Sequence, residues 1–391
     1  MLIVLKFGGS SVATVEKIYN AAHIAANFVH KGEKVVIVVS AKGDTTDELL
    51  KQAAEISDRP SLRELDALLA VGEQTSAALM AMCLENMGIS AISLCGWQAG
   101  VLTDANHGEA RILGMYTDRV ESELKNGRAV IVAGFQGINR YGDVTTIGRG
   151  GSDTSAVAFA ASLKADKCLI YTDVDGVYSA DPRTVPQALK HDEIYYDEML
   201  EMASLGAGVL HNRSVELAKN TDVVIKVLRS YDSKGGTEVS KMAMEGKKVV
   251  GVTRDTNTAL IEVKGSDMGS LPSVLKLFAE NDITSDMMTS IDGRLGITVP
   301  RSKIEQARKV LCEYGFETEK ISVDANVAKV SVVGCGLGGD PNVAAKMLNS
   351  IKEKGVDVKS VVAGEIRISA LVPDIYADIA VRAIHKAFFE K

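Results

Sequence analysis

Short apolar runs alternate with helical patterns over residues 2–240, and this alternation constrains the fold more than any other feature. The runs of strand length are residues 3–7, 35–40, 91–94, 129–133, 168–171 and 223–228. Between them, apolar residues recur three and four positions apart over residues 11–31, 62–87, 111–126 and 153–163. Strands that are apolar on both faces are typical of parallel sheets covered by helices on both sides. We therefore expect an α/β domain with a mainly parallel central sheet over residues 1–245.

After residue 246 the pattern changes, and two stretches repeat one plan of strand, helix, strand, strand, helix. The first covers residues 259–314 and the second residues 328–389. Pro272-Ser-Val in the first stretch corresponds to Pro341-Asn-Val in the second. This order of elements indicates ferredoxin-like α+β modules. We expect two of them, at residues 246–325 and 326–391.

The composition excludes several classes of protein. Hydrophobic residues make up 46% and charged residues 24%, as in ordinary globular proteins. The net charge is −7 and no run of Lys and Arg stands out, which argues against a nucleic-acid partner. The strongest apolar runs are far shorter than the ~20 residues that a membrane span needs. The five cysteines are scattered without a Cys-x-x-Cys pair, so we expect a reduced, cytoplasmic protein without structural zinc.

Three polar segments lie at the ends of predicted strands or of a strand-like run, the position where open α/β sheets bind ligands. The first, Lys6-Phe-Gly-Gly-Ser-Ser, sets a lysine and two glycines before a predicted helix, a pattern that suits an anion. The second, Gly148-Arg-Gly-Gly-Ser-Asp, sets Arg149 between glycines, which suits bidentate contact with a carboxylate or phosphate. Ser152 in that segment is also a candidate helix N-cap. The third, residues 171–183, suits a ribose or base, although its Asp-Gly pair alone indicates a turn.

The sequence contains no P-loop motif, Gly-x-x-x-x-Gly-Lys-Ser/Thr. Gly334, Gly336 and Gly339 match a dinucleotide-binding spacing, but they lie inside the second repeat, which is too small for the sheet that such a site needs. We interpret them as a tight turn.

Together these segments resemble the amino-acid kinase family, and within it the aspartate kinases. The opening at Lys6 is similar to the family's Lys-Phe-Gly-Gly-Thr-Ser, with Ser10 in place of Thr. Residues 40–47, 72–73, 148–155 and 172–183 match further blocks in the right order, and the tail resembles tandem ACT domains. The resemblance covers essentially the whole chain. It implies a three-layer amino-acid kinase fold with a mainly parallel sheet, followed by two ACT modules.

The activity that the resemblance implies is phosphorylation of the L-aspartate side-chain carboxylate by Mg-ATP. The product is 4-phospho-L-aspartate, the first intermediate on the way to lysine, threonine and methionine. A carboxylate with a pKa near ~4 is ionised at pH 7, so the transfer needs no general base. Catalysis then requires aligning two anions and neutralising charge on the transferred group. Mg²⁺ is expected to be held mainly through the phosphates, without a metal site made by the protein alone.

The resemblance also implies roles for individual residues. The ATP-binding residues implied are Lys6, Gly8, Gly9, Ser10, Thr172, Asp173, Tyr178 and Arg183. The aspartate-binding residues implied are Ser40, Thr46, Glu73, Arg149, Gly150 and Ser152. Lys6 and Asp153 form the expected catalytic pair. Lys6 is expected to face the phosphates together with the N–H groups of Gly8 and Gly9. Asp153 is expected to orient Lys6 or the substrate ammonium group.

Two of these assignments have alternatives. Arg149 is expected to bind the α-carboxylate and Glu73 the α-amino group of aspartate, but a solvated glutamate on an amphipathic helix is an equally good interpretation of Glu73. Either Lys226 or Lys234 adds a further cation at the phosphates, and the sequence does not decide between them.

ACT modules usually bind a small amino acid at an interface between two modules. The resemblance therefore implies a homodimer or higher homo-oligomer formed through the ACT modules, with lysine or threonine as effector. Sensitive family members carry Ser-Thr-Ser where this chain has Val362-Ala363-Gly364, so we expect this inhibition to be lost. The polar residues that remain as candidates for an effector site are Asp267, Asn281, Asp282 and Asp286.

Three other functions remain as alternatives. One is a kinase of the same fold that acts on N-acetylglutamate or UMP, against which the repeated tail argues. Another is a catalytically weak amino-acid sensor that binds its ligand through the ACT pair. The last is a nucleotide-binding scaffold without transfer activity. The retained Lys6, Arg149 and Asp153 favour the kinase over the sensor.

Overall fold

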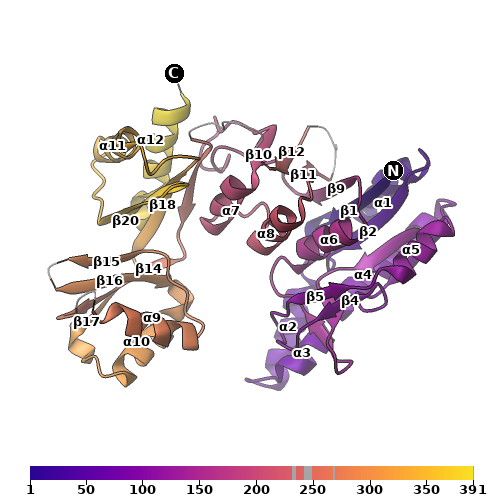
Figure 1. Cartoon of the computed structure of the whole chain (residues 1–391), viewed down its shortest axis with the longest axis horizontal. Coiled ribbons are helices and arrows are strands. Elements are labelled where there is room, and N and C mark those ends of the chain that lie inside the picture. Colours follow the sequence, from indigo (N-terminus) through magenta and orange to yellow (C-terminus); the bar gives the residue numbers. More distant parts are fainter. Residues whose placement is uncertain (231–234, 242–248, 267–268, 292, 391) are drawn as a thin grey trace. The chain divides into compact units, whose positions relative to one another are not determined.

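The computed structural model describes residues 1–230, 235–241, 249–266, 269–291 and 293–390 (Figure 1). The chain forms two compact units. The first contains Met1–Val177, Lys190–Ala203 and Gly208–Glu245. The second contains Tyr178–Leu189, Ser204–Ala207 and Gly246–Lys391.

An eight-stranded sheet forms the centre of the first unit, in the order β10-β12-β11-β9-β1-β2-β6-β3. Its strands are β1 (Leu2–Phe7), β2 (Lys34–Val39), β3 (Ala91–Leu94), β6 (Ala129–Ala133), β9 (Lys167–Thr172), β10 (Glu193–Tyr195), β11 (Ile225–Arg229) and β12 (Thr237–Ser240). Every predicted strand of the first domain belongs to this sheet, and β11 with β12 is the one antiparallel pair among its described strands. The prediction of a mainly parallel sheet is confirmed.

Helices cover both faces of this sheet, as predicted. On one face, α1 (Val15–Val29) and α4 (Val71–Asn86) share a core with Ile3, Leu5 and Phe7 of β1. On the other, α6 (Gly151–Ser162) packs on β1, β2 and β9, and α8 (Asn212–Thr221) packs against α6. Successive side chains of a strand point to opposite faces, so Lys6 lies on the face that α6 covers.

A second, smaller sheet was not predicted from the sequence. It has the order β5-β4-β7-β8 and consists of β4 (Val101–Thr103), β5 (Ile112–Met115), β7 (Gln136–Ile138) and β8 (Val144–Thr146). The helix predicted over residues 111–126 is wrong over its first part. Residues 112–115 pair with β4 instead, because cross-strand pairing outweighs local helical spacing, and a helix begins only with α5 (Asp118–Lys125).

Two other predicted helices have different bounds. The expected helix at residues 11–31 starts at Val15, where Thr14 accepts the Lys17 N–H, and Gly9–Ser11 form a separate 3-10 turn. The expected helix at residues 62–87 is interrupted at Ala70, between α3 (Leu62–Leu69) and α4. The Ala70 carbonyl accepts a hydrogen bond from Gln136 Nε2 at 2.8 Å, which anchors this break. The remaining helices of this part are α2 (Thr45–Ile56) and α7 (Tyr196–Ser204).

The segment Leu62–Asn86 is long and apolar enough to cross a membrane by length and composition alone. However, 56% of its apolar window is buried inside the structure. Met80 and Leu84 lie fully buried in the core, and α4 packs against β3 and β6. Its apolar character therefore fits a core helix of the α/β domain.

Two four-stranded antiparallel sheets form the second unit, which confirms the two ferredoxin-like modules. The first has the order β15-β16-β14-β17 and the second the order β13-β18-β20-β19. The first contains β14 (Thr258–Lys264), β15 (Met288–Ile291), β16 (Arg294–Pro300) and β17 (Ile321–Asp324), with α9 (Leu271–Glu280) and α10 (Ile304–Glu313). The second contains β13 (Gly251–Asp255), β18 (Val327–Val333), β19 (Ser360–Ala363) and β20 (Arg367–Pro373), with α11 (Pro341–Lys352) and α12 (Ala377–Phe389).

The strand β13 completes the sheet of the second module, although its residues precede the first. It pairs antiparallel with β18, in the position that β17 occupies beside β14. The module boundaries at residues 246–325 and 326–391 stay a prediction. The sequence did not predict that β13, which lies within the first of these ranges, joins the sheet of the second module. Gly334, Gly336 and Gly339 lie in the loop between β18 and α11, in agreement with a tight turn.

Candidate active site

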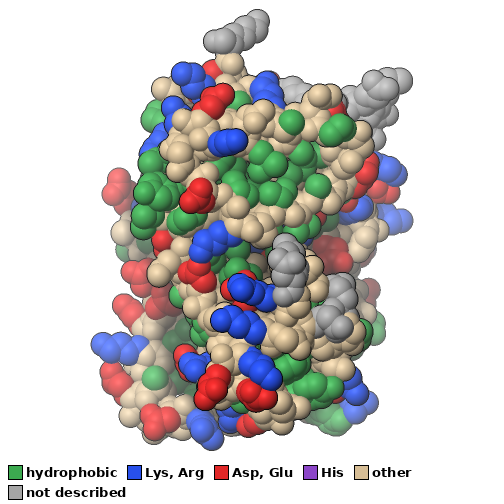
Figure 2. Space-filling view, turned by 90° about the vertical axis from the view of Figure 1, so that its left-hand side faces the viewer, with side chains coloured by type: hydrophobic (Ala, Val, Ile, Leu, Met, Phe, Trp, Pro, Cys, Tyr) green, Lys and Arg blue, Asp and Glu red, His purple; other side chains and the backbone are tan. Residues whose placement is uncertain are grey.

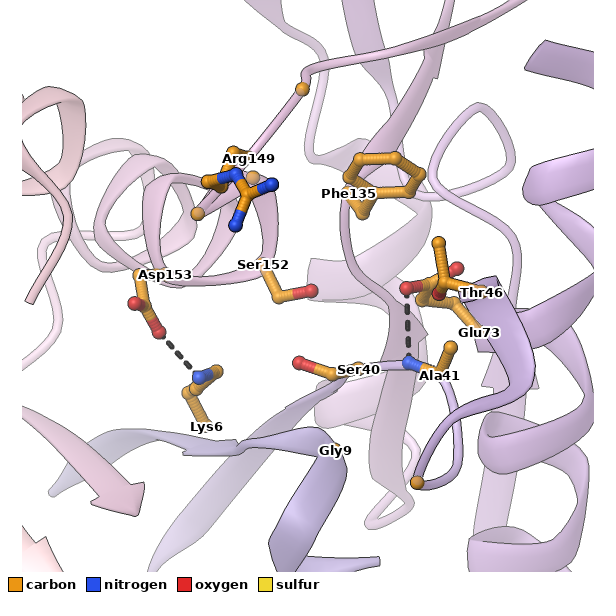
Figure 3. Close-up of a pocket in the computed structure, with 14 residues that line it drawn as sticks. Lys6, Gly9, Ser40, Ala41, Thr46, Glu73, Phe135, Arg149, Ser152 and Asp153 are labelled. Carbon is orange, nitrogen blue, oxygen red and sulfur yellow. Dashed lines mark hydrogen bonds and ion pairs between the residues drawn. The ribbon is translucent and has the colours of Figure 1, made fainter. Parts of the chain in front are cut away.

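A pocket of about 230 Å³ lies at the carboxyl ends of β1 and β2 in the first unit (Figure 3). Segments far apart in the sequence line it, and they include most of the predicted site. The predicted residues that line it are Lys6, Gly9, Ser40, Thr46, Glu73, Arg149, Gly150, Ser152 and Asp153. Figure 3 shows Lys6 and Asp153 on one side of the pocket, Thr46 and Glu73 on the other, and Ser40 and Ser152 between them.

Lys6 and Asp153 form an ion pair at the pocket wall. The distance from Lys6 Nζ to Asp153 Oδ1 is 2.5 Å, and the two side chains are only 10% and 13% exposed. Lys6 comes from β1, and Asp153 from the first turn of α6 on the same face of the sheet. Because little solvent screens the pair, their attraction is stronger than at an open surface. The ammonium group of Lys6 is thereby held at a fixed place beside the pocket.

Glu73 is buried, so its interpretation as a solvated helix residue is wrong. It is 4% exposed, and its Oε1 accepts the Ala41 N–H at 2.9 Å. Burial raises the pKa of Glu73 to about 7. Its Oε2 is also buried, and no hydrogen-bond partner is found for it among the described residues. Gly72 allows Ala41 to come close enough to α4 for its hydrogen bond with Glu73, because a Cβ on residue 72 would lie 2.8 Å from the Ala41 Cβ.

The Arg149 segment approaches the pocket through a left-handed turn. Gly150 has φ +72° and is the N-cap residue of α6, so the prediction that Ser152 caps this helix is wrong. A side chain at Gly150 would also collide with His211, since its Cβ would lie 2.2 Å from the His211 Cβ. Arg149 is exposed, and for its guanidinium no hydrogen bond or ion pair is described in this part of the structure. A free guanidinium at a pocket edge is suited to a carboxylate.

The Gly8–Ser10 turn differs in detail from the expectation. The Gly8 N–H donates to the Tyr171 carbonyl at 3.2 Å, so it is already paired and does not face a phosphate as predicted. Gly8 and Ser10 do not line the pocket, whereas Gly9 does. The expected helix N-terminus at this turn is absent because α1 begins only at Val15.

The other predicted ATP-binding residues lie outside the pocket. Thr172 ends β9, next to β1, and its hydroxyl donates to Asp173 Oδ1 at 3.0 Å. Tyr178 and Arg183 belong to the second compact unit. The Arg183 guanidinium makes three hydrogen bonds to Asp181, at 3.0, 3.2 and 2.9 Å, and holds the pKa of that carboxyl below its usual value.

The choice between the two lysines is not resolved. Lys226 lies within β11, opposite Leu169 of β9. Lys234 lies outside the described residues, as does the effector candidate Asp267.

Phe135 is the main pocket residue that sequence reasoning missed. It lines the pocket with φ +68°, a backbone conformation that few non-glycine residues adopt and that is frequent at functional sites. One signal was available, since Gly134-Phe135 directly follows β6 at the same sheet edge as the other site loops. Ala41, Gly43, Gly148 and Gly151 also line the pocket. They lie in the predicted segments, but no role had been assigned to them individually.

Comparisons with known proteins agree with this fold. Residues 1–228 match the model of the amino acid kinase family, and residues 330–388 match an ACT domain model. Aspartokinase 2 of Bacillus subtilis is 45% identical, over 99% of this chain and 97% of the relative. The aspartokinase of Thermus thermophilus is 42% identical, over 99% of this chain and 98% of the relative.

Solved structures show the same architecture. Escherichia coli aspartokinase III, in complex with aspartate and ADP, has a TM-score of 0.85 at 23% identity, and each chain is covered completely. The aspartate kinase of Synechocystis has a TM-score of 0.58 at 37% identity, over 99% of this chain and 69% of that chain. The chain belongs to the amino acid kinase family and, within it, to the aspartokinases. Phosphorylation of aspartate at the expense of ATP is the activity of that group, and this chain is an enzyme of that kind.

Proposed function

We propose that the pocket around Glu73 and Arg149 binds L-aspartate by both ends and presents its side-chain carboxylate to ATP beside Lys6. The observation that carries this proposal is the distribution of charge. A buried carboxylate oxygen without a described partner lies on one side of the pocket, and two cations, Lys6 and Arg149, belong to its lining. L-Aspartate carries one ammonium group and two carboxylates, which is the complementary set.

In this arrangement each group of aspartate has a partner. Arg149 binds the α-carboxylate, and Glu73 Oε2 accepts hydrogen bonds from the ammonium group. Hydrogen bonds from Ser40, Thr46, Ser152 and the Gly150 segment complete the site. The side-chain carboxylate is ionised at neutral pH and attacks the γ-phosphorus directly, without a base. Asp153 then serves to hold Lys6 in place.

ATP is proposed to lie on the Lys6 side of the pocket, where the ammonium group neutralises charge on the transferred phosphoryl group. Gly9, Ser10, Thr172 and Asp173 lie at the carboxyl ends of the neighbouring strands β1 and β9, and Tyr178 and Arg183 stay further candidates. That Escherichia coli aspartokinase III has been solved with aspartate and ADP supports this pair of ligands.

Mg²⁺ is proposed to accompany ATP. Among the described residues, no group of three or more His, Cys, Asp and Glu side chains is arranged to hold a metal ion. We propose that the ion takes most of its oxygen ligands from phosphates and water, as is usual for Mg²⁺.

The reaction is tested by trapping its product with hydroxylamine. Purified protein with Mg-ATP, L-aspartate and hydroxylamine is expected to yield the side-chain hydroxamate of aspartate, identified by mass spectrometry. N-acetylglutamate is expected to give none, because its acylated nitrogen offers Glu73 no ammonium group. Hydroxamate from N-acetylglutamate, or none from aspartate with a folded, ATP-binding protein, would contradict the proposal. The second result would favour the amino-acid sensor.

The pKa of Glu73 predicts a pH dependence of aspartate binding. Above pH 7 the carboxylate is charged and attracts the substrate ammonium group; below pH 7 it becomes protonated and loses that attraction. The KM for aspartate is therefore expected to rise about tenfold per pH unit below pH 6, while the KM for ATP stays nearly constant. Glu73→Gln is expected to raise the aspartate KM at pH 8 and to remove its pH dependence. An unchanged pH profile in that variant would show that another group titrates.

Regulation and assembly are proposed to involve the ACT modules. Escherichia coli aspartokinase III has also been solved with lysine and aspartate, which supports an amino-acid effector for this fold. Large apolar residues exposed in the second unit include Val361, Ile375, Tyr376 and Ile379. Figure 2 shows apolar side chains gathered in the upper part of one face of the molecule. These features favour a homodimer or higher homo-oligomer. Separately, we propose that the protein is cytoplasmic.

The candidate effector residue Asp286 already has partners in this chain. Its carboxylate contacts Lys329, which is almost fully buried, and accepts the Thr298 hydroxyl at 2.8 Å. Val362 and Ala363 lie in β19, directly before Gly364. Loss of inhibition by lysine and threonine through these three residues stays a prediction.

A further inference from the structure

We propose that Asp66 is a positioning residue for aspartate binding. It lies on α3, outside the pocket, and its carboxylate ties the segment that carries Glu73 to the segment that carries Arg149. Asp66 thereby sets the spacing between the site for the substrate ammonium group and the site for its α-carboxylate. This inference rests on the roles proposed above for Glu73 and Arg149.

The Asp66 carboxylate is buried and fully engaged. The residue is 1% exposed, and the Thr146 hydroxyl donates to its Oδ1 at 2.5 Å. The Gly108 N–H lies 3.1 Å from both oxygens, and His107 Nδ1 lies 2.8 Å from Oδ2. A carboxylate can only accept hydrogen bonds, so His107 carries its proton on Nδ1. Such a buried carboxylate fixes its donors firmly, because each would otherwise be left without a partner.

These donors lead directly to Arg149. Thr146 is the last residue of β8, three positions before Arg149, and its carbonyl accepts the Ala110 N–H at 2.9 Å. Gly108 packs against Gly148, since a Cβ on Gly148 would lie 3.0 Å from the Gly108 carbonyl oxygen. The residues that Asp66 holds therefore support the base of the Arg149 turn.

A cation, Arg213 of α8, holds the same segments from the other side. Arg213 donates to the Ala110 carbonyl at 2.8 Å and also to the Ile147 carbonyl. Its contacts join the two loops that Asp66 engages. The turn that carries Arg149 therefore starts from backbone that is held by hydrogen bonds. Asp66 connects this backbone to α3.

The backbone of Asp66 is linked in turn to Glu73. Its carbonyl accepts the Ala70 N–H at 3.0 Å, and the Ala70 carbonyl is held by Gln136 where α3 meets α4. Glu73 follows in the first turn of α4. The helix α3 also packs directly against β8. Movement of Asp66 relative to β8 would accordingly change the distance between Glu73 and Arg149.

The test uses the full-length protein and the isosteric variant Thr146→Val, which removes one donor to Asp66. The KM for aspartate is expected to rise about tenfold, with kcat and the KM for ATP changed less than about twofold. Thr145→Val is the matched control. Thr145 lies in the same strand and is fully buried, but its hydroxyl pairs with Thr103 at 2.6 Å instead of with Asp66. It is expected to leave the aspartate KM within about twofold of the original value.

Asp66→Asn extends the test, with circular dichroism to confirm folding. The asparagine oxygen accepts the Thr146 hydroxyl, but its amide nitrogen, which is a donor, then faces the His107 N–H. We therefore expect a rise in the aspartate KM at least as large as in Thr146→Val. Should this variant not fold, Thr146→Val still decides the question. Equal changes in the KM values for aspartate and ATP, or the same change in Thr145→Val, would overturn the inference in favour of a merely structural role.

A double-mutant cycle separates this inference from the proposed function. In an Arg149→Ala background, Thr146→Val is expected to have no further effect on the aspartate KM, because the arginine that it displaces is gone. Full additivity of the two changes would contradict the positioning role. If Arg149→Ala alone leaves the aspartate KM unchanged, the proposed function fails. If that variant raises the KM and Thr146→Val does not, only the inference about Asp66 fails.

Discussion

The variant Lys6→Met is expected to lower kcat about a thousandfold, with a much smaller change in the KM for aspartate. Methionine fills a similar volume on the α6 face of the sheet but brings no charge to the transferred phosphoryl group. The loss appears mainly in kcat because the need for a cation is greatest when phosphoryl transfer is under way. Steady-state production of ADP, measured with saturating aspartate, gives the value directly.

The partner of Lys6 requires a control. Lys6→Met leaves the carboxylate of Asp153 largely buried without its ion pair, which lowers stability by itself. The double variant Lys6→Met/Asp153→Asn removes that charge and is expected to recover thermal stability without recovering kcat. A decrease in kcat of less than about tenfold in the folded double variant would contradict the catalytic role of Lys6.

The variant Arg149→Ala is expected to raise the KM for aspartate about a hundredfold or more, because the α-carboxylate loses a bidentate partner. Arg149 is exposed and has no described partner in the protein, so little stability is lost. The comparison of aspartate with β-alanine sharpens the test, since β-alanine has the ammonium group and the reacting carboxylate but lacks the α-carboxylate. The original enzyme is expected to prefer aspartate by about a hundredfold, and the variant by less than about tenfold.

Two outcomes of this comparison would contradict the role of Arg149. One is an unchanged preference for aspartate over β-alanine in Arg149→Ala. The other is a large fall in the rate of β-alanine turnover, which would place the arginine at the phosphoryl group instead. Arg149→Lys is the matched control, and it is expected to recover only part of the affinity because an ammonium group lacks the planar fork of a guanidinium.

The fold was predictable where local sequence decides it. The runs at residues 3–7 and 35–39 are buried on both faces. Apolar runs of this kind are typical of the central strands of a parallel sheet and occur in few other settings. Strands of three or four residues, such as β4 and β8, carry too short a pattern to be detected. At residues 112–115 the helical spacing was real, but pairing with β4 outweighed it.

In the candidate site too, the residues identified by local sequence were predictable and those that depend on distant contacts were not. Lys6 and Arg149 were predictable because glycine-rich turns after strands identify them locally. The burial of Glu73 was not, since it depends on the interruption at Ala70, which Gln136 anchors from a distant part of the sequence. Asp66 was missed for the same reason, because its partners His107 and Thr146 lie 41 and 80 residues away in the sequence. Contacts of this kind leave no periodic signal in one sequence.

A crystal structure of the protein with L-aspartate, Mg²⁺ and a non-hydrolysable ATP analogue tests the central claim most directly. The account predicts that the α-carboxylate contacts the Arg149 guanidinium and that the ammonium group lies within hydrogen-bond distance of Glu73 Oε2. The side-chain carboxylate then points at the γ-phosphorus beside Lys6. Aspartate bound in the reverse sense, with its side-chain carboxylate on Arg149, would contradict it.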